Sequence, residues 1–373
     1  MPHRLSPISK YISSERPKLV YIELTRSCDL ACKHCRAEAM KSNDPLELSR
    51  EEAFQLLTDI KGFGDPMPHI VLTGGDPLNY PYIFETISKG KELGIGVSLS
   101  PSATKNLNAD LFKKLKELGV QSISLSLDGA TAAGHDAFRG VPGCFDDTMR
   151  AAKLAGEANM PFQINTLVSE NTANELPIIF DEIRHLKGLN RWSVFFLISV
   201  GRGTELKELS PGKTEQVMHW LADIAKDSPF PVKTTEAPHF RRVELERDRN
   251  HIATHKQPLL LQQGYGIRDG NGILFISHHG DVYPSGFMPL VAGNIRESNI
   301  VDIYRDSDVF ELVRDPANFE GKCGDCEYRY ICGGSRARAY AATGNPIASD
   351  PLCAYKPRSN KIKKSKVELV EID

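Results

Sequence analysis

The sequence lacks a surplus of charge of either sign. Its 373 residues hold 46 Lys and Arg against 48 Asp and Glu, for a net charge of −2. A chain this close to neutrality has no global field that would recruit nucleic acid or an anionic membrane, so neither is expected as a partner. The one basic cluster, from Lys356 to Lys366, is interpreted as a solvated tail.

Long hydrophobic runs are absent as well. No segment reaches the ~18 uninterrupted apolar residues of a membrane helix, and the N-terminus has no apolar run typical of a signal peptide. We therefore expect a cytoplasmic protein. With 40% hydrophobic and 25% charged residues, the composition is that of a globular chain, long enough for one large domain and a smaller one.

Cysteine is nearly absent outside two short groups. Cys28, Cys32 and Cys35 form the first group, and Cys144 stands alone. The second group lies near the C-terminus and comprises Cys323, Cys326, Cys332 and Cys353. Because structural disulfides are not expected in a reducing compartment, both groups need another explanation.

Apolar runs alternate with helical patterns over the first part of the chain. The predicted strands are 18–25, 69–74, 96–100, 122–127, 162–168 and 192–200. Helix-length segments such as 50–63 and 173–186 follow most of them, which indicates an α/β fold with a parallel sheet covered by helices. The sheet is either an open barrel or doubly wound, since a full barrel needs eight such units. After about residue 227 the sequence is rich in turns, with hairpin turns at "GNG" and "HHGD" and one helix over about 300–314.

The first cysteine group follows the first predicted strand directly. A loop in this place lies at the carboxyl edge of the sheet, where α/β proteins carry their chemistry. Three thiolates on a short loop suit an iron–sulfur cube with one iron left free of protein ligands. The alternatives are a structural zinc site with a fourth ligand such as His34, or an accidental run of thiols.

The spacing C-x3-C-x2-C in "CDLACKHC", with "TGGDP" after the second strand, resembles the radical S-adenosylmethionine (SAM) superfamily. The resemblance implies a partial (β/α)6 barrel. It also implies a [4Fe-4S] cluster on Cys28, Cys32 and Cys35, with SAM bound to the fourth iron. One electron, from a reduced flavodoxin- or ferredoxin-type donor, would then split SAM into methionine and a 5′-deoxyadenosyl radical that takes a hydrogen atom from the substrate.

The resemblance also assigns SAM contacts. Gly74, Gly75 and Asp76 match a Gly-Gly-Glu-Pro motif near the methionine amino group, with Asp76 in place of the usual Glu; the alternative is a plain turn between strand and helix. His34 holds a place where the family has an aromatic residue near adenine, and no catalytic proton is assigned to it.

Further cofactor contacts are expected at the ends of the third, fourth and fifth strands. Arg139 resembles the arginine that pairs with the SAM carboxylate, a task suited to a planar guanidinium; the alternative is a surface arginine. The remaining candidates are polar side chains whose alternative is an ordinary inward-facing position, namely Ser102, Ser126, Asp128 and Asn165.

The second cysteine group supplies four thiolates, enough to close an auxiliary [4Fe-4S] cluster, with structural zinc as the alternative. Its surroundings, "CGDCEYRYICGGSRARAYAATGNP", resemble the SPASM/twitch extensions of radical SAM maturases. A full extension carries seven cysteines for two clusters, but Ser285, Ser298 and Arg336 stand where three of them would be. We therefore predict one auxiliary cluster, and Cys144 is interpreted as a small apolar filler.

Three segments resemble the radical SAM enzymes of alternative haem biosynthesis. They are "LVYIELTRSCDLACKHCRAEA", "LDGATAAGHDAFRGVPG" and "YICGGSRARAYAATG". This resemblance implies a tetrapyrrole substrate changed at its propionates, for example by decarboxylation. Arg202 and either Arg241 or Arg242 are the arginines expected to pair with propionates, and the alternative for each is a solvated role. The alternatives are a maturase acting on a ribosomally made peptide, and a non-catalytic Fe–S electron carrier.

The predicted organisation has five parts. They are an N-terminal extension 1–17, a radical SAM core 18–227, a linker 228–262, an auxiliary-cluster domain 263–357 and a basic tail 358–373.

Overall fold

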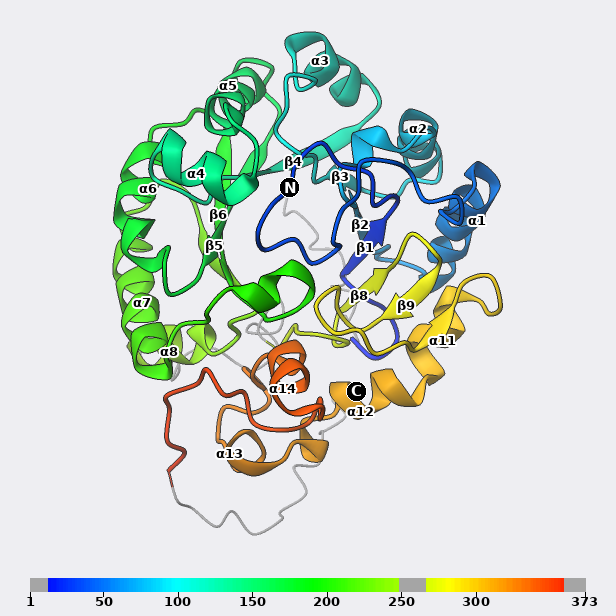
Figure 1. Cartoon of the computed structure of the whole chain (residues 1–373). Helices are drawn as coiled ribbons and strands as arrows, with labels where there is room; N and C mark the ends of the chain where they lie inside the picture. The colour runs from blue at the N-terminus through cyan, green and yellow to red at the C-terminus, as the bar shows by residue number, and fades with distance from the viewer. Residues whose placement is uncertain (1–12, 248–265, 359–373) are drawn as a thin grey trace, which may run out of the picture.

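Figure 1 shows the computed structural model, which describes residues 13–247 and 266–358. Most of the predicted N-terminal extension 1–17, the end of the predicted linker 228–262 and nearly all of the predicted tail 358–373 lie outside the described residues. Within the described ranges, no helix has the length and apolar character needed to cross a membrane.

The described strands form one ten-stranded sheet in the order β10-β9-β8-β1-β2-β3-β4-β5-β6-β7. Neighbours from β8 through β1 to β7 are parallel, and β8, β9 and β10 are joined antiparallel. The strands are β1 (Leu19–Glu23), β2 (His69–Thr73), β3 (Val97–Leu99), β4 (Val120–Ser126), β5 (Phe162–Val168), β6 (Leu189–Phe196), β7 (Val232–Thr235), β8 (Ile273–Ile276), β9 (Asp281–Tyr283) and β10 (Gly293–Asn294). Each of the six predicted strands is therefore confirmed.

Helices surround the outer face of the curved sheet, as Figure 1 shows for α1 to α8. The helices of this layer are α1 (Arg50–Ile60), α2 (Ile83–Glu92), α3 (Ala109–Glu117), α4 (Ala132–Arg139), α5 (Cys144–Glu157), α6 (Leu176–Ile183), α7 (Pro211–Ile224) and α8 (Phe240–Arg247). Later in the chain come α11 (Ile300–Asp306), α12 (Asp308–Arg314), α13 (Gly321–Gly324) and α14 (Arg336–Thr343). Helix α1 begins at Arg50 because Ser49 and Glu52 form a reciprocal capping box there.

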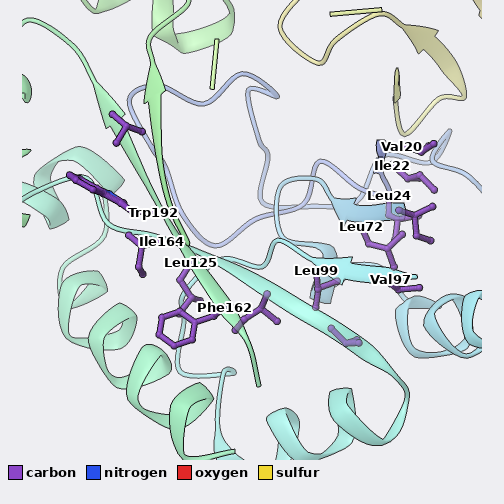
Figure 2. Packing of buried hydrophobic residues seen from close by; sticks show 14 of the residues in the cluster. Val20, Ile22, Leu24, Leu72, Val97, Leu99, Leu125, Phe162, Ile164 and Trp192 are labelled. Atoms are coloured by element: carbon purple, nitrogen blue, oxygen red, sulfur yellow. The ribbon is translucent and has the colours of Figure 1, made fainter. Parts of the chain in front are cut away.

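The two faces of the sheet differ in chemistry. On the outer face, residues such as Leu125, Ile164 and Trp192 are buried against the helices, and Figure 2 shows this packing. Since side chains alternate along a strand, the residues between them point to the inner face. There Ser122, Ser124 and Ser126 of β4 are only partly buried. The helices thus cover an apolar face, and the inner face carries serines along β4.

The structure departs from the predicted organisation in two places. The described part of the predicted linker 228–262 contains β7, which pairs with β6, and α8. Strand β8, in the predicted auxiliary domain, pairs in parallel with β1, so both regions share one sheet.

The C-terminal helix and hairpin were also predicted. The helix over 300–314 is two helices, since the side chain of Ser307 accepts a hydrogen bond from Val309 and begins α12. The hairpin turn at "HHGD" is confirmed between β8 and β9.

Candidate active site

The first three cysteines lie on a loop that leaves the carboxyl end of β1. Cys28 and Cys32 are buried and Cys35 is partly buried. The loop is closed at its base, where the Cys28 amide donates to Met40 O and the Met40 amide to Arg26 O. We refer to residues 25–40 as the cysteine loop.

Hydrogen-bond donors surround the three sulfurs. The Leu30 amide donates to Cys28 Sγ at 3.3 Å, and the Ala39 amide donates to Cys35 Sγ at 3.4 Å. Arg139 Nη1 lies 3.5 Å from Cys32 Sγ. Burial raises the pKa of the Cys28 thiol, and the hydrogen bonds from Ser102 and Leu30 oppose this rise. Donors aimed at sulfur favour thiolates, so this donor set fits a metal cluster.

The cysteine loop is in backbone contact with the "GGDP" turn that follows β2. The Gly75 amide donates to Thr25 O and the Asp76 amide to Ser27 O, both at 2.7 Å. A Cβ atom on Gly75 would lie 2.5 Å from the carbonyl oxygens of both Arg26 and Ser27. Only glycine therefore allows this close approach of the turn to the cysteine loop.

Asp76 is fully buried beneath the turn. Its Oδ1 accepts the Leu78 amide at 3.0 Å, and burial raises the pKa of the carboxyl to about 6. Asp76 thereby caps the short 3-10 helix Pro77–Asn79, and a short carboxylate suits this cap, which gives a structural reason for Asp at a position where the resemblance expects Glu.

We expect Gly75→Ala to weaken SAM binding by about tenfold or more, because the added methyl group pushes the turn off the loop that leads to Cys28. SAM affinity of the anaerobically reconstituted protein, measured by equilibrium dialysis, checks this expectation. Gly212→Ala is the matched control, because a Cβ on Gly212 in α7 meets nothing within 4 Å. Equal affinity in the two variants would contradict the expectation.

Arg139 is buried, so the alternative of a surface arginine is wrong. It forms an ion pair with Asp128, which also accepts the Leu167 amide at 2.7 Å. Burial acts to raise the pKa of Asp128, but the Arg139 guanidinium, the neighbouring histidines His34 and His135 and the Leu167 amide together lower it below its usual value. The pair thus joins the end of β4 to the cysteine loop through the contact of Arg139 with Cys32.

The other predicted cofactor contacts lie along the same edge of the sheet. Ser102 contacts Cys28 Sγ at 3.2 Å and Gly75 O at 3.4 Å, so it bridges the cysteine loop and the "GGDP" turn. Ser126 and Asn165 are paired in register on β4 and β5, and both are partly exposed. Gln163 donates to Asn165 Oδ1 at 2.9 Å.

His34 lies within the cysteine loop, and Cys144 packs against the loop. The His34 ring is stacked on Phe138 with centroids 4.9 Å apart. Burial and then the Arg139 guanidinium lower the pKa of His34 to about 4, so the imidazole is neutral at pH 7. Cys144 is buried beside Leu30 and Cys32, and burial raises its thiol pKa to about 11.

The arginines expected to bind propionates have partners within the protein. Arg202 Nε donates to Cys32 O at 2.9 Å, and Arg202 Nη1 donates to Ala39 O. Arg242 is buried and forms ion pairs with Glu215 and Glu246. Arg202 therefore binds the cysteine loop, and Arg242 ties α8 to α7 and is not open to a ligand.

The four C-terminal cysteines come together. Cys323, Cys326, Cys332 and Cys353 line one hollow, together with His239 and Tyr355. The Gly334 amide donates to Cys332 Sγ at 3.3 Å and the Asp350 amide to Cys323 Sγ at 3.4 Å. Burial raises the pKa of Cys332 to about 12 and that of Cys326 to about 11, so a metal must replace the thiol protons if these sulfurs act as thiolates.

The three residues at the positions of missing cysteines have other surroundings. Ser285 donates to Glu236 Oε1 at 3.3 Å, and Ser298 is exposed. Arg336 is fully buried, donates to Ala348 O at 2.7 Å and lies 3.6 Å from Cys323 Sγ.

The buried Arg338 and the partly buried Glu236 near the site were not predicted. Arg338 of α14 donates to Glu236 O, to Leu197 O and to Glu208 Oε2, so it joins the ends of β6 and β7 to the C-terminal region. Burial and the neighbouring Asp269 raise the pKa of Glu236, whose side chain accepts from Ser335 at 2.6 Å. The only sequence signal for Arg338 was a charged residue within the helix that follows Cys332.

Comparison with known proteins gives consistent matches. Residues 22–183 match the family described as the radical SAM superfamily. The chain is 38% identical to an AdoMet-dependent heme synthase of Methanosarcina barkeri, over 91% of this chain and 97% of the relative. It is 39% identical to an AdoMet-dependent heme synthase of Nitratidesulfovibrio vulgaris, over 91% of this chain and 93% of the relative.

A solved structure, Streptococcus suis SuiB bound to precursor peptide SuiA, superposes with a TM-score of 0.72 at 19% identity. The match covers 91% of this chain and 76% of SuiB. At this identity the likeness concerns the fold, and it confirms the expected α/β architecture.

Proposed function

The chain belongs to the radical SAM superfamily, and on that premise we propose that it is a tetrapyrrole-modifying enzyme that converts propionate side chains to vinyl groups. The family membership makes the protein an enzyme that uses SAM and a [4Fe-4S] cluster, so the electron-carrier alternative is wrong.

One observation carries the choice of substrate. Both relatives above 30% identity described here are named AdoMet-dependent heme synthases, and each match covers 91% of this chain. The peptide-bound SuiB structure, at 19% identity, supports the fold and says little of the substrate. Ser122, Gln163 and Asn165 on the inner face of β4 and β5 are partly exposed polar side chains that suit a substrate carrying carboxylates.

We propose that Cys28, Cys32 and Cys35 hold the SAM-binding cluster. When bound, the cluster and SAM together supply a 5′-deoxyadenosyl radical, which is chemistry that no side chain can perform. Burial of Cys28 and Cys32 keeps water away from these two sulfurs. Arg202 fixes the shape of the cysteine loop through Cys32 O and Ala39 O.

SAM would lie between the cysteine loop and the ends of β2 to β5. The backbone of Gly74, Gly75 and Asp76 would face its methionine part, and Ser102 would line the same place. Asp128 and Arg139 already form an ion pair, so we propose that Arg139 uses its remaining donors for the SAM carboxylate. Ser126 and Asn165 would border the ribose or the substrate.

We propose that Cys323, Cys326, Cys332 and Cys353 hold an auxiliary [4Fe-4S] cluster. Loss of a hydrogen atom and of carbon dioxide from a propionate leaves one electron to remove, and an auxiliary cluster would supply an acceptor. Arg338 keeps this region against the ends of β6 and β7. The electron for SAM cleavage would come from a reduced flavodoxin- or ferredoxin-type protein.

The test is to incubate the reconstituted protein with SAM, dithionite and iron coproporphyrin. We expect a shifted Soret band on binding, and a product that has lost carbon dioxide and two hydrogens for each changed side chain, measured by mass spectrometry. SAM cleavage with no porphyrin binding and an unchanged porphyrin mass would overturn the tetrapyrrole proposal and leave a peptide substrate as the alternative.

A further inference from the structure

Three metal-ligating side chains from distant parts of the sequence meet beside the carboxyl end of β1. Ligand atoms of Asp44, His278 and His279 all lie within 4.8 Å of one another. Asp44 follows the cysteine loop, and the two histidines form the turn between β8 and β9. Neither cysteine group includes these residues, so they need a separate explanation.

The buried histidine is oriented by a carboxylate behind it. His278 Nδ1 lies 2.7 Å from Glu23 Oε1, and Glu23 also forms an ion pair with Arg36 through its other oxygen. A carboxylate held by arginine can only accept, so Nδ1 carries the hydrogen and Nε2 of a neutral ring carries the lone pair. A histidine backed by a carboxylate in this way is the usual arrangement at metal centres.

The lone pair of His278 points to the other two residues and has no partner. His278 is only 7% exposed, and its Nε2 is buried without a hydrogen bond among the described residues. Nε2 lies 3.9 Å from Asp44 Oδ2, too far for a hydrogen bond. A buried nitrogen lone pair left unsatisfied costs free energy, and a cation between it and the carboxylate would remove that cost.

Asp44 and His279 complete the set. The Leu46 amide binds Asp44 Oδ1 at 2.9 Å, which leaves Oδ2 for the two rings. His279 Nε2 lies 3.1 Å from that oxygen, and the two imidazole rings have centroids 4.0 Å apart. The His279 side chain is 35% exposed, so an ion could reach the group from solvent.

We propose that Asp44, His278 and His279 bind one first-row divalent cation, with Zn²⁺ as the best-suited ion. Two imidazoles exclude a preference for Mg²⁺ or Ca²⁺, which take oxygen ligands. Three protein ligands leave a coordination position open to water or to an anionic ligand. The bound ion ties the segment after the cysteine loop to the β8–β9 turn, and so joins two regions that the sequence separates.

The test uses the full chain with its iron–sulfur clusters reconstituted and ZnCl2 as the probe. For the wild type, we expect equilibrium dialysis followed by elemental analysis to find about one zinc per chain with the iron content unchanged. We expect His279→Ala and Asp44→Asn to lower zinc affinity tenfold or more. His185→Ala is the matched control, because His185 is exposed and its ring accepts a hydrogen bond from its neighbour Arg184. A zinc-dependent rise in the unfolding temperature should be present in the wild type and in this control, and absent in His279→Ala.

Iron content identifies zinc that has entered a cysteine group, since such zinc replaces iron. Zinc uptake that is equal in the wild type, Asp44→Asn and His279→Ala overturns the proposal. So does the absence of uptake by a protein that keeps its iron. In either case the three residues are a hydrogen-bonded cluster that connects the two segments.

Discussion

Replacing Cys28, Cys32 and Cys35 together with alanine is expected to abolish formation of 5′-deoxyadenosine. The three thiolates are the protein ligands that the cysteine loop offers, and without them SAM has no cluster to bind. The C-terminal cysteines are on separate elements, so the variant should keep about four irons per chain by thiolate count. Chromatography of methionine and 5′-deoxyadenosine after dithionite reduction, with iron analysis, measures both outcomes.

Cys144→Ala is the control for this experiment. Cys144 is buried beside Leu30 and Cys32, so its replacement disturbs packing around the same loop without removing a proposed ligand. Full SAM cleavage by Cys144→Ala and none by the triple variant would assign the cluster to the loop. Persistent cleavage by the triple variant would show that the SAM-binding cluster lies elsewhere.

Much of the fold could be predicted because its signals are local. Continuous apolar runs marked the six strands, and the capping box of Ser49 and Glu52 marks the start of α1. Strand β7 was missed because "VKTT" is short and has little apolar character, and its pairing with β6 defines it. The break at Ser307 was missed because the apolar pattern continues through it, whereas the serine side chain caps the second helix.

Among the site residues, those in local motifs could likewise be predicted, and contacts between distant parts of the sequence could not. Motif spacing pointed to the cysteines and to the glycines of the "GGDP" turn. It could not reveal that Arg202 binds the backbone of the cysteine loop, since this contact spans 170 residues of sequence. The Asp44, His278 and His279 group was missed for the same reason, because parallel pairing of β8 with β1 brings its two halves together. Contacts set by strand order cannot be predicted from spacing alone.

The arrangement of the C-terminal cysteines bears on the number of iron–sulfur clusters that each chain holds. Cys323, Cys326, Cys332 and Cys353 line one hollow, and amides at Gly334 and Asp350 donate to two of the sulfurs. A cluster held by all four thiolates is closed, so none of its irons is free to bind substrate. Such a cluster suits electron transfer or stabilisation of the C-terminal region.

The three positions that a second auxiliary cluster would need are used otherwise. Ser285 hydrogen-bonds Glu236, and Ser298 is exposed. Arg336 is buried with its guanidinium on the carbonyls of Pro346 and Ala348, and it lies near Cys323 Sγ. An arginine beside a thiolate stabilises its negative charge, so Arg336 would support the proposed auxiliary cluster and offers no ligand to another.

The reconstituted wild-type protein is therefore expected to hold about eight irons per chain. Cys353→Ala should lower this count by up to about four, because the loss of one of four thiolates opens or empties the auxiliary site. This variant should keep reductive SAM cleavage, since Cys353 and the cysteine loop lie on separate segments, and should lose conversion of the porphyrin. Iron and zinc analysis, with both product assays, measures these outcomes. An iron content near twelve would contradict a single auxiliary [4Fe-4S] cluster, because a third cluster needs ligands that Ser285, Ser298 and Arg336 do not offer. Stoichiometric zinc that Cys353→Ala removes would also contradict it, because zinc would then occupy the same four thiolates.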